Sequence, residues 1–309
     1  MRIVFMGTPD FAEVSLQALI DAGHNVVGVY CQPDKPVGRK HVLTPPEVKV
    51  CAQNAGIPVF QPASLRKQEA IDELRALEPE LIVVVAYGKI LPPDIIHMPK
   101  YGCINVHGSL LPAYRGAAPV HWSVIHGCEK TGVTTMYMDE GLDTGDMIDK
   151  AETVIGPDET SGEVYDRLAK MGAELLLETI VKIKDGTATR EKQDDALSNY
   201  APLLNKEIAV IDFNKSAAEV KNLIRGLNPW PIAFTKFDGK KLKVFSCEIV
   251  SGNCGVAPGE IVADNTLTVA CGDGNSVRFK DVLLEGSKRC DDKSFLLGHP
   301  TKKHKLLGE

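Results

Sequence analysis

The stretch from Cys103 to Met147 decides the fold, and it opens with C-I-N-V-H at residues 103–107. This apolar run predicts a buried strand. Side chains alternate along a strand, so Asn105 and His107 are expected to project side by side from one face. The run leads at once into G-S-L-L-P-A-Y-R-G-A-A-P at 108–119, which is rich in turn-forming residues. The amide and the imidazole are therefore expected near the end of a strand, where a loop begins.

A second apolar run, G-V-T-T-M-Y-M at 132–138, predicts another strand, and it ends in a glycine-rich turn. Asp143 lies in that turn between Gly141 and Gly145. An amide, an imidazole and a carboxylate are the groups needed for acyl transfer to an amine, because they can stabilise an oxyanion, handle a proton and orient the imidazole. Each of these residue types alone is more often a turn or capping group. Their combination beside two buried strands favours a site at the strand ends of an open α/β sheet.

The length and composition are those of a two-domain globular protein, with 309 residues, 44% of them hydrophobic and 25% charged. The chain has no apolar run long enough to span a bilayer, and M-R-I-V-F-M-G at its start lacks a signal-peptide layout. We therefore expect no membrane partner. The eight cysteines form no C-x-x-C pair, which argues against a zinc site and against a secreted disulfide framework. We expect a cytoplasmic protein without a metal.

The net charge of −6 disfavours a general nucleic-acid binder, but the charge is unevenly distributed. Residues 207–309 hold 15 Lys and Arg against 13 Asp and Glu, whereas residues 1–206 hold 20 against 28. Basic clusters occur at 240–243 (K-K-L-K) and at 302–305 (K-K-H-K). Such clusters are usually solvated surfaces, so alone they do not define a binding site.

The first residues predict a strand, a helix and a second strand, with the opening strand at 2–6. This order is typical of a nucleotide-binding unit, yet Gly7 is followed by Thr8 and the G-x-G-x-x-G pattern is absent. This argues against a dinucleotide-dependent dehydrogenase, and the P-loop pattern G-x-x-x-x-G-K-[ST] is also absent from the sequence. The continuous apolar run L-I-V-V-V-A-Y at 81–87 predicts a central parallel strand that is covered on both faces.

Two helices and one loop add detail to this domain. The pattern from Ser64 to Leu77 predicts a helix with Ser64 as its N-cap. Thr160 and Glu163 predict a capping box at the start of a long helix. The loop at 32–46 is long, proline-rich and basic at its centre, which is typical of a functional or disordered segment.

The polar stretch from Thr187 to Lys206 lacks sustained periodicity and predicts a linker. Beyond it, a helix at 217–226 is followed by short strand-like runs that are separated by frequent turns, which predicts a small β-barrel. We therefore predict a Rossmann-like catalytic domain at 1–188, a linker at 189–206 and a C-terminal barrel domain at 207–309.

Six stretches of the chain resemble the methionyl-tRNA formyltransferase family, and together they extend over almost the whole sequence. They are M-G-T-P-D-F-A at 6–12, A-Y-G-K-I-L-P at 86–92, I-N-V-H-G-S-L-L-P at 104–112, R-G-A-A-P at 115–119, G-L-D-T-G-D-M at 141–147 and L-I-R-G-L-N-P-W-P at 223–231. The resemblance implies the formyltransferase fold, with an N-terminal Rossmann-like open sheet and a C-terminal OB-like barrel that binds tRNA. It also implies transfer of a formyl group from 10-formyltetrahydrofolate to the methionine of initiator methionyl-tRNA, by a monomer without a metal.

The resemblance also assigns roles to individual residues. Catalysis falls to Asn105, His107 and Asp143. Contacts with the folate fall to two loops, Ala86, Tyr87 and Gly88 in one and Ser109, Leu110, Leu111 and Pro112 in the other. Contact with the tRNA falls to Arg39 and Lys40 in the 32–46 loop.

This chain departs from the family pattern at two places. R-K-H-V stands at 39–42, where relatives often carry two lysines after the G-R pair, so Arg39 is our first choice for the tRNA contact. Tyr114 stands where tryptophan is common.

Two alternatives remain open from the residues alone. A formyltransferase or hydrolase with the same core could act on a small molecule, but such a substrate does not need a basic second domain. A non-enzymatic RNA-binding protein would use the barrel alone, but it would not need Asn105, His107 and Asp143 together. Turnover with different formyl acceptors distinguishes these functions.

Overall fold

The computed structural model describes residues 1–38 and 41–308, and these form two units that are interleaved along the chain. The first unit comprises Met1–Gly116, Thr131–Thr153 and Tyr165–Ala201, and the second comprises Ala117–Lys130, Val154–Val164 and Pro202–Glu309. The predicted domains at 1–188 and 207–309 are each one continuous segment of the chain, whereas each of these two units combines three separate segments. The predicted domain boundaries stay a prediction.

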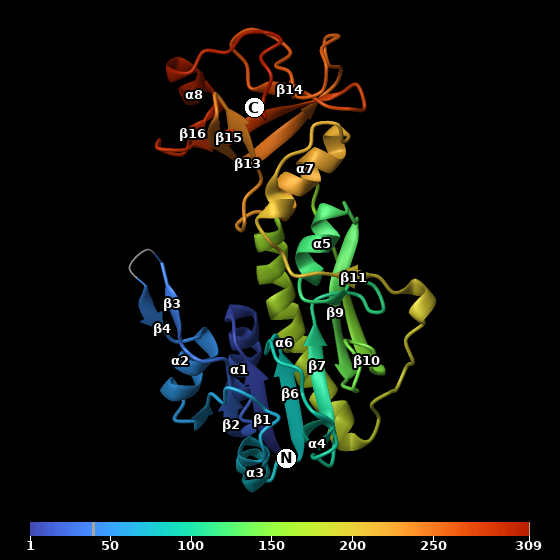
Figure 1. Cartoon of the computed structure of the whole chain (residues 1–309). Coiled ribbons are helices and arrows are strands. Elements are labelled where there is room, and N and C mark those ends of the chain that lie inside the picture. The colour runs from blue at the N-terminus through green and yellow to red at the C-terminus, as the bar shows by residue number, and fades with distance from the viewer. Residues whose placement is uncertain (39–40, 309) are drawn as a thin grey trace. The chain divides into compact units, whose positions relative to one another are not determined.

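A seven-stranded sheet forms the centre of the first unit, in the order β10-β9-β7-β6-β1-β2-β5 (Figure 1). Parallel pairing joins β1 to β2 and β6, β6 to β7, and β2 to β5, whereas β7 and β9 are antiparallel. The strands are β1 (Arg2–Gly7), β2 (Asn25–Tyr30), β5 (Val59–Phe60), β6 (Leu81–Val85), β7 (Cys103–His107), β9 (Lys130–Tyr137) and β10 (Met147–Val154). All five residues of β6 are buried, as expected for an apolar strand with both faces covered.

Helices cover both faces of this sheet. Ile71 and Leu74 of α3 and Ile95 and Ile96 of α4 belong to one core cluster with strand residues such as Val84 and Cys103. A side chain at Gly172 of α6 would lie within 2.9 Å of Val106, so α6 packs closely on the opposite face of β7. The helices of this unit are α1 (Asp10–Asp21), α2 (Glu47–Asn54), α3 (Gln68–Ala76), α4 (Pro93–Ile96) and α6 (Ser161–Asp185), whose first turn counts with the second unit.

Short elements complete the first unit. A hairpin lies within the 32–46 loop, and a small parallel pair forms where the chain returns after α6. They are β3 (Lys35–Val37) with β4 (Val42–Thr44), and β8 (Arg115–Gly116) with β11 (Tyr200–Ala201), preceded by the 3-10 helix η1 (Asp195–Leu197).

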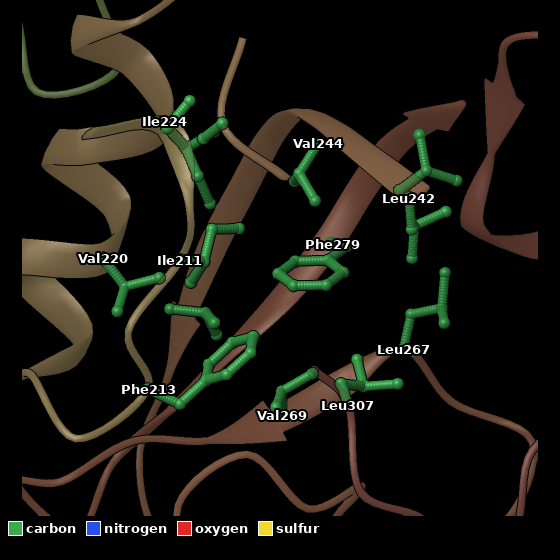
Figure 2. Close-up of a cluster of buried hydrophobic side chains, with 14 of the residues drawn as sticks. Ile211, Phe213, Val220, Ile224, Leu242, Val244, Leu267, Val269, Phe279 and Leu307 are labelled. Carbon is green, nitrogen blue, oxygen red and sulfur yellow. The ribbon is translucent and has the colours of Figure 1, made fainter. Parts of the chain in front are cut away.

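The second unit is built on antiparallel strands in the order β12-β13-β15-β14, with β16 paired to β15. Figure 2 shows Val220 and Ile224 of helix α7 beside strand side chains of the same core, including Phe279 and Val244. Its elements are α5 (Pro119–Ile125), η2 (Glu207–Ala209), α7 (Ala217–Gly226), β12 (Phe234–Phe237), β13 (Lys240–Val250), β14 (Thr268–Ala270), β15 (Ser276–Leu284), β16 (Cys290–Asp291) and α8 (Asp292–Gly298). The predicted combination of a Rossmann-like sheet with a C-terminal domain of antiparallel strands is confirmed.

The predicted helix starts have different outcomes. The capping box before α6 is confirmed, because Thr160 N donates to Glu163 Oε2 at 2.8 Å and Glu163 N donates to Thr160 Oγ1 at 3.3 Å. The prediction that Ser64 caps α3 is wrong. That helix begins at Gln68, and the Ser64 hydroxyl instead accepts from the nearby Arg66 N within a turn. A serine can stabilise a local turn as well as a helix end, so its spacing alone did not determine which.

Candidate active site

Asn105 and His107 lie on the same face of β7, because they are two residues apart on a regular strand. Both are well buried, with 8% and 5% of their surfaces exposed. Val106 between them points to the opposite face, where α6 packs. The carboxyl end of β7 is therefore an edge of the sheet at which an amide and an imidazole are held by a rigid strand.

The two ring nitrogens of His107 face different oxygen atoms. Nε2 lies 2.9 Å from the carbonyl oxygen of Tyr114, and Nδ1 lies 3.7 Å from Oδ2 of Asp143. A carbonyl only accepts, so Nε2 carries a hydrogen and donates it to Tyr114. The other ring nitrogen, Nδ1, is the atom that faces the Asp143 carboxylate.

Asp143 lies on a tight turn, as its flanking glycines predict. Its φ of +53° is in the left-handed region, and its side chain is 15% exposed. The backbone N–H of Gly116 donates to Oδ2 of Asp143 at 2.8 Å. A side chain at Gly145 would lie 1.8 Å from the Tyr137 carbonyl oxygen, so glycine is required there for the turn to approach β9. The turn therefore brings Asp143 to His107.

The Asn105 carboxamide makes no hydrogen bond to any residue that the structure describes. It lies on the strand face that carries His107, roughly 7 Å away along the chain. A buried amide with unused donors is a suitable partner for a developing negative charge on a bound group. Of the three candidate catalytic residues, the structure brings His107 and Asp143 together directly, and it places Asn105 beside them on one strand.

The loop that follows β7 is held by Thr134 on the neighbouring strand. Thr134 Oγ1 donates to the Ser109 carbonyl at 2.7 Å, and it accepts from Leu111 N at 3.1 Å. The Ser109 hydroxyl is buried and donates to Ala113 O at 2.6 Å. Leu111 is also buried, whereas Leu110 and Pro112 are partly exposed. Of the four residues of this loop that we predict to contact the folate, Leu110 and Pro112 are therefore the ones with accessible surface.

The loop that follows β6 has an exposed backbone and a buried aromatic ring. Ala86 and Gly88 are exposed and have φ values of +44° and +77°. Tyr87 is 2% exposed, and its carbonyl oxygen accepts from Thr8 Oγ1 and from Gln32 Nε2, each at 3.0 Å. Burial raises the pKa of the Tyr87 hydroxyl. Contact with a ligand would therefore come from the backbone here and not from the tyrosine ring.

Arg39 and Lys40, which we predict to contact tRNA, lie outside the described residues. Near its start, the 32–46 loop is held by a polar cluster at Asp34. Lys49 Nζ lies 2.8 Å from Oδ1 of Asp34, and Gln61 Nε2 donates to the same oxygen. The hydrogen bonds from Lys49 and Gln61 lower the pKa of the Asp34 carboxyl.

Across residues 1–38 and 41–308, no group of three or more His, Cys, Asp and Glu side chains is arranged to hold a metal ion. None of the helices within the same ranges is long and apolar enough to cross a membrane.

The contacts that residues 114–116 make around this site were not predicted from the sequence. Residues 114–116 contact both His107 and Asp143, through Tyr114 O and Gly116 N. Residues 187–201, predicted as a linker, bind this strip: Arg115 N donates to Asn199 O at 3.0 Å. The available signal was the length of a polar segment without periodicity, which suggests a structured or functional loop but identifies no partner.

Family models and curated relatives match the chain along its length. A formyl transferase model matches residues 1–180, and a model of the formyl transferase C-terminal domain matches residues 203–300. The methionyl-tRNA formyltransferase of Citrifermentans bemidjiense is 51% identical over 311 residues, which covers 100% of this chain and 97% of the relative. That of Lachnospira eligens is 51% identical over 316 residues and covers all of both chains.

This chain belongs to the methionyl-tRNA formyltransferase family. Solved structures of other formyltransferases share its fold at lower identity. The Helicobacter canadensis N-formyltransferase, solved with folinic acid and dTDP-3-aminofucose, has a TM-score of 0.67 and 20% identity, and the match covers 90% of this chain and 98% of that one. The sugar 3N-formyltransferase WlaRD has a TM-score of 0.68 and 19% identity, with 93% and 99% covered. At these identities the likeness shows the fold alone, so the methionyl-tRNA formyltransferase relatives carry the family assignment.

Proposed function

We propose that this protein transfers the formyl group of 10-formyltetrahydrofolate to the amino group of methionine on initiator methionyl-tRNA. The observation that carries the proposal is the His107–Asp143 pair beside Asn105, in a chain half identical over its whole length to methionyl-tRNA formyltransferases. The product, N-formylmethionyl-tRNA, is the form of the initiator that serves translation initiation. We further propose that the enzyme acts as a monomer in the cytoplasm.

The proposed chemistry starts with attack of the methionine amine on the formyl carbon. A C–N bond forms, and negative charge develops on the formyl oxygen. In the proposed mechanism the Asn105 NH₂ group and a protonated His107 donate hydrogen bonds to that oxygen. In this structure His107 Nε2–H is directed at Tyr114 O, so donation to the substrate requires that this N–H be shared or released. Contacts of this kind often tighten only when substrates are bound.

Collapse of the tetrahedral intermediate completes the transfer. The bond from the formyl carbon to N10 of the folate breaks, the amine gives up one proton, and N10 gains one. Asp143 stabilises the imidazolium of His107, accepts the amine proton through a water molecule and passes that proton on to N10 of the folate.

Binding of the two substrates is assigned to different parts of the chain. We propose that 10-formyltetrahydrofolate binds between the loops at 86–88 and 109–112. We propose that Arg39, Lys40 and the second unit bind the tRNA, and that the chain is organised as a catalytic domain at 1–188, a linker at 189–206 and a tRNA-binding domain at 207–309.

The proposed function is tested by offering several formyl acceptors in parallel. The protein is incubated with 10-formyltetrahydrofolate and either initiator methionyl-tRNA, elongator methionyl-tRNA, glycinamide ribonucleotide, an amino-sugar nucleotide or buffer alone. We expect rapid formylation of the initiator methionyl-tRNA, with little product from the small amines and little hydrolysis in buffer. Faster formylation of a small amine, or equal loss of formyl groups in buffer, would overturn the proposal.

A further inference from the structure

Gln193 uses its side-chain amide to connect three parts of the first unit. Its Oε1 accepts from Nε of Arg115 at 3.0 Å. Its Nε2 donates to the carbonyl oxygens of Asp143 and Gly145, each at 2.8 Å. The Gln193 NH₂ group therefore donates both its hydrogens to the turn that carries Asp143, and the Gln193 side-chain oxygen accepts from the strip at 114–116.

The strip at 114–116 in turn contacts both members of the His107–Asp143 pair. Tyr114 O accepts from His107, and Gly116 N donates to the Asp143 carboxylate. Gln193 therefore holds the backbone of Asp143 against the segment that already holds its side chain. Together these bonds fix the turn at both its backbone and its carboxylate.

The turn needs such support for a physical reason. Asp143 has a left-handed backbone with a φ of +53°, a conformation that is sterically unfavourable for a residue other than glycine. Gly141 and Leu142 beside it are exposed, so packing holds that part of the turn weakly. Without the two bonds from Gln193, the turn has less to oppose its relaxation, and a displacement of about 1 Å can lower a rate by about 10²-fold.

We propose that Gln193 is a positioning residue that holds Asp143 toward His107 for formyl transfer. This inference rests on the proposed function for its kinetic consequence, although its structural part can be tested without turnover. Gln193 does not act on substrate atoms. Its effect passes through Asp143.

Loss of Gln193 should leave the protein folded, because other bonds hold the same segment. Thr189 Oγ1 donates to Ile148 O at 2.9 Å, and Glu191 exchanges two backbone hydrogen bonds with Met147 at 2.8 and 2.9 Å. The guanidinium of Arg190 stacks on the Tyr137 ring at 3.6 Å. The segment at 187–201 thus stays attached on the N-terminal side of Gln193.

The informative substitution is Gln193→Glu. A glutamate has nearly the same shape, and it can still accept from Arg115, but it cannot donate to the carbonyls of Asp143 and Gly145. It would place negative oxygen against those two carbonyls and so release the turn. Gln68→Glu is the matched control, because the Gln68 side chain donates to Asp72 on an exposed helix of the same unit and the charge change is identical.

The kinetic test is a double-mutant cycle with Asp143→Asn, measured as kcat for formylation of initiator methionyl-tRNA. We expect Gln193→Glu to lower kcat by ~10–100-fold, with little change in KM for 10-formyltetrahydrofolate. In the Asp143→Asn background the same change should have almost no further effect, because the group it positions is already gone. An equal decrease of kcat in both backgrounds would overturn the proposal, as would an equal decrease in Gln68→Glu.

Amide hydrogen exchange tests the structural part independently of activity. We expect faster exchange in peptides covering residues 138–146 of Gln193→Glu, and unchanged exchange in peptides from β1 and β6. Unchanged exchange at 138–146 would overturn the inference. If the wild-type protein fails to formylate methionyl-tRNA while the exchange result holds, the proposed function fails and the positioning of the turn stands.

Discussion

The side chains of His107 and Asp143 meet although they lie on different elements, with Nδ1 of His107 3.7 Å from Oδ2 of Asp143. A straight strand supplies His107 and a left-handed turn supplies Asp143. The strip at 114–116 contacts both, so the pair does not depend on its own attraction to stay together. Strand and strip therefore preorganise the pair before any substrate binds.

We predict that Asn105→Ala and His107→Ala each lower kcat by ~10²–10⁴-fold, the usual range for an oxyanion donor or an acid–base group. Asn105→Asp is a near-isosteric companion, since it keeps the shape but removes the NH₂ donor. Steady-state formylation and thermal unfolding are measured together. Variants that are folded yet lose less than roughly tenfold in kcat would show that these groups are not catalytic.

Arg39 and Lys40 are predicted to engage the tRNA as part of the basic 32–46 loop. Limited proteolysis should cut within residues 32–46 more slowly when initiator tRNA is present. Inorganic polyphosphate, a polyanion without tRNA structure, serves as the control and should protect less. Arg39→Ala should remove much of the tRNA-dependent protection. Equal cleavage with and without tRNA would contradict the prediction.

Three lysines on the second unit are predicted to bind tRNA phosphates. Lys236 pairs with Lys241 across β12 and β13, and Lys243 lies on the same outward face, opposite the buried Leu242. Replacing all three with alanine should weaken tRNA binding. The slope of log Kd against log salt should fall by about 0.7–0.9 for each phosphate that a lysine no longer neutralises.

A matched variant with Lys67→Ala, Lys100→Ala and Lys170→Ala separates this local effect from a general change in net charge. All three control lysines are exposed, and all belong to the first unit. The control should retain the wild-type salt slope. If both variants show the same slope, the outward face of β12 and β13 does not bind the tRNA.

Thiol reactivity should differ between the exposed Cys254 and the buried thiols. Burial raises the pKa of Cys103 and of Cys247 to about 12, so few of their side chains are thiolates at pH 8. We expect the fast phase of labelling with a thiol reagent at pH 8 to be smaller in Cys254→Ser and unchanged in Cys103→Ser and Cys247→Ser. A fast phase of unchanged size in Cys254→Ser would contradict this.

Local patterns predicted those parts of the structure that depend on neighbouring residues. Strand alternation predicted that Asn105 and His107 share a face, and two glycines predicted the turn at Asp143. The same approach failed at Ser64, because a serine followed by a helical pattern can stabilise a turn instead of the helix end.

Contacts between distant segments could not be predicted in this way. Gln193 and Asn199 lie in a polar stretch without periodicity, and their importance comes from bonds to Asp143, Gly145, Tyr114 and Arg115. The grouping of residues 117–130 and 154–164 with the second unit is likewise set by packing. Periodicity reports which side of an element is apolar, but it does not identify the partner.

The most direct test of the central claim is single-turnover formylation of initiator methionyl-tRNA by the wild-type protein and by Asp143→Asn, with 10-formyltetrahydrofolate bound beforehand. The asparagine keeps the shape of the side chain but removes the charge that faces His107. We predict a rate lowered by ~10²–10⁴-fold with nearly unchanged affinity for the folate. A wild-type rate in the Asp143→Asn variant, with the same pH dependence, would contradict the role of the His107–Asp143 pair in formyl transfer.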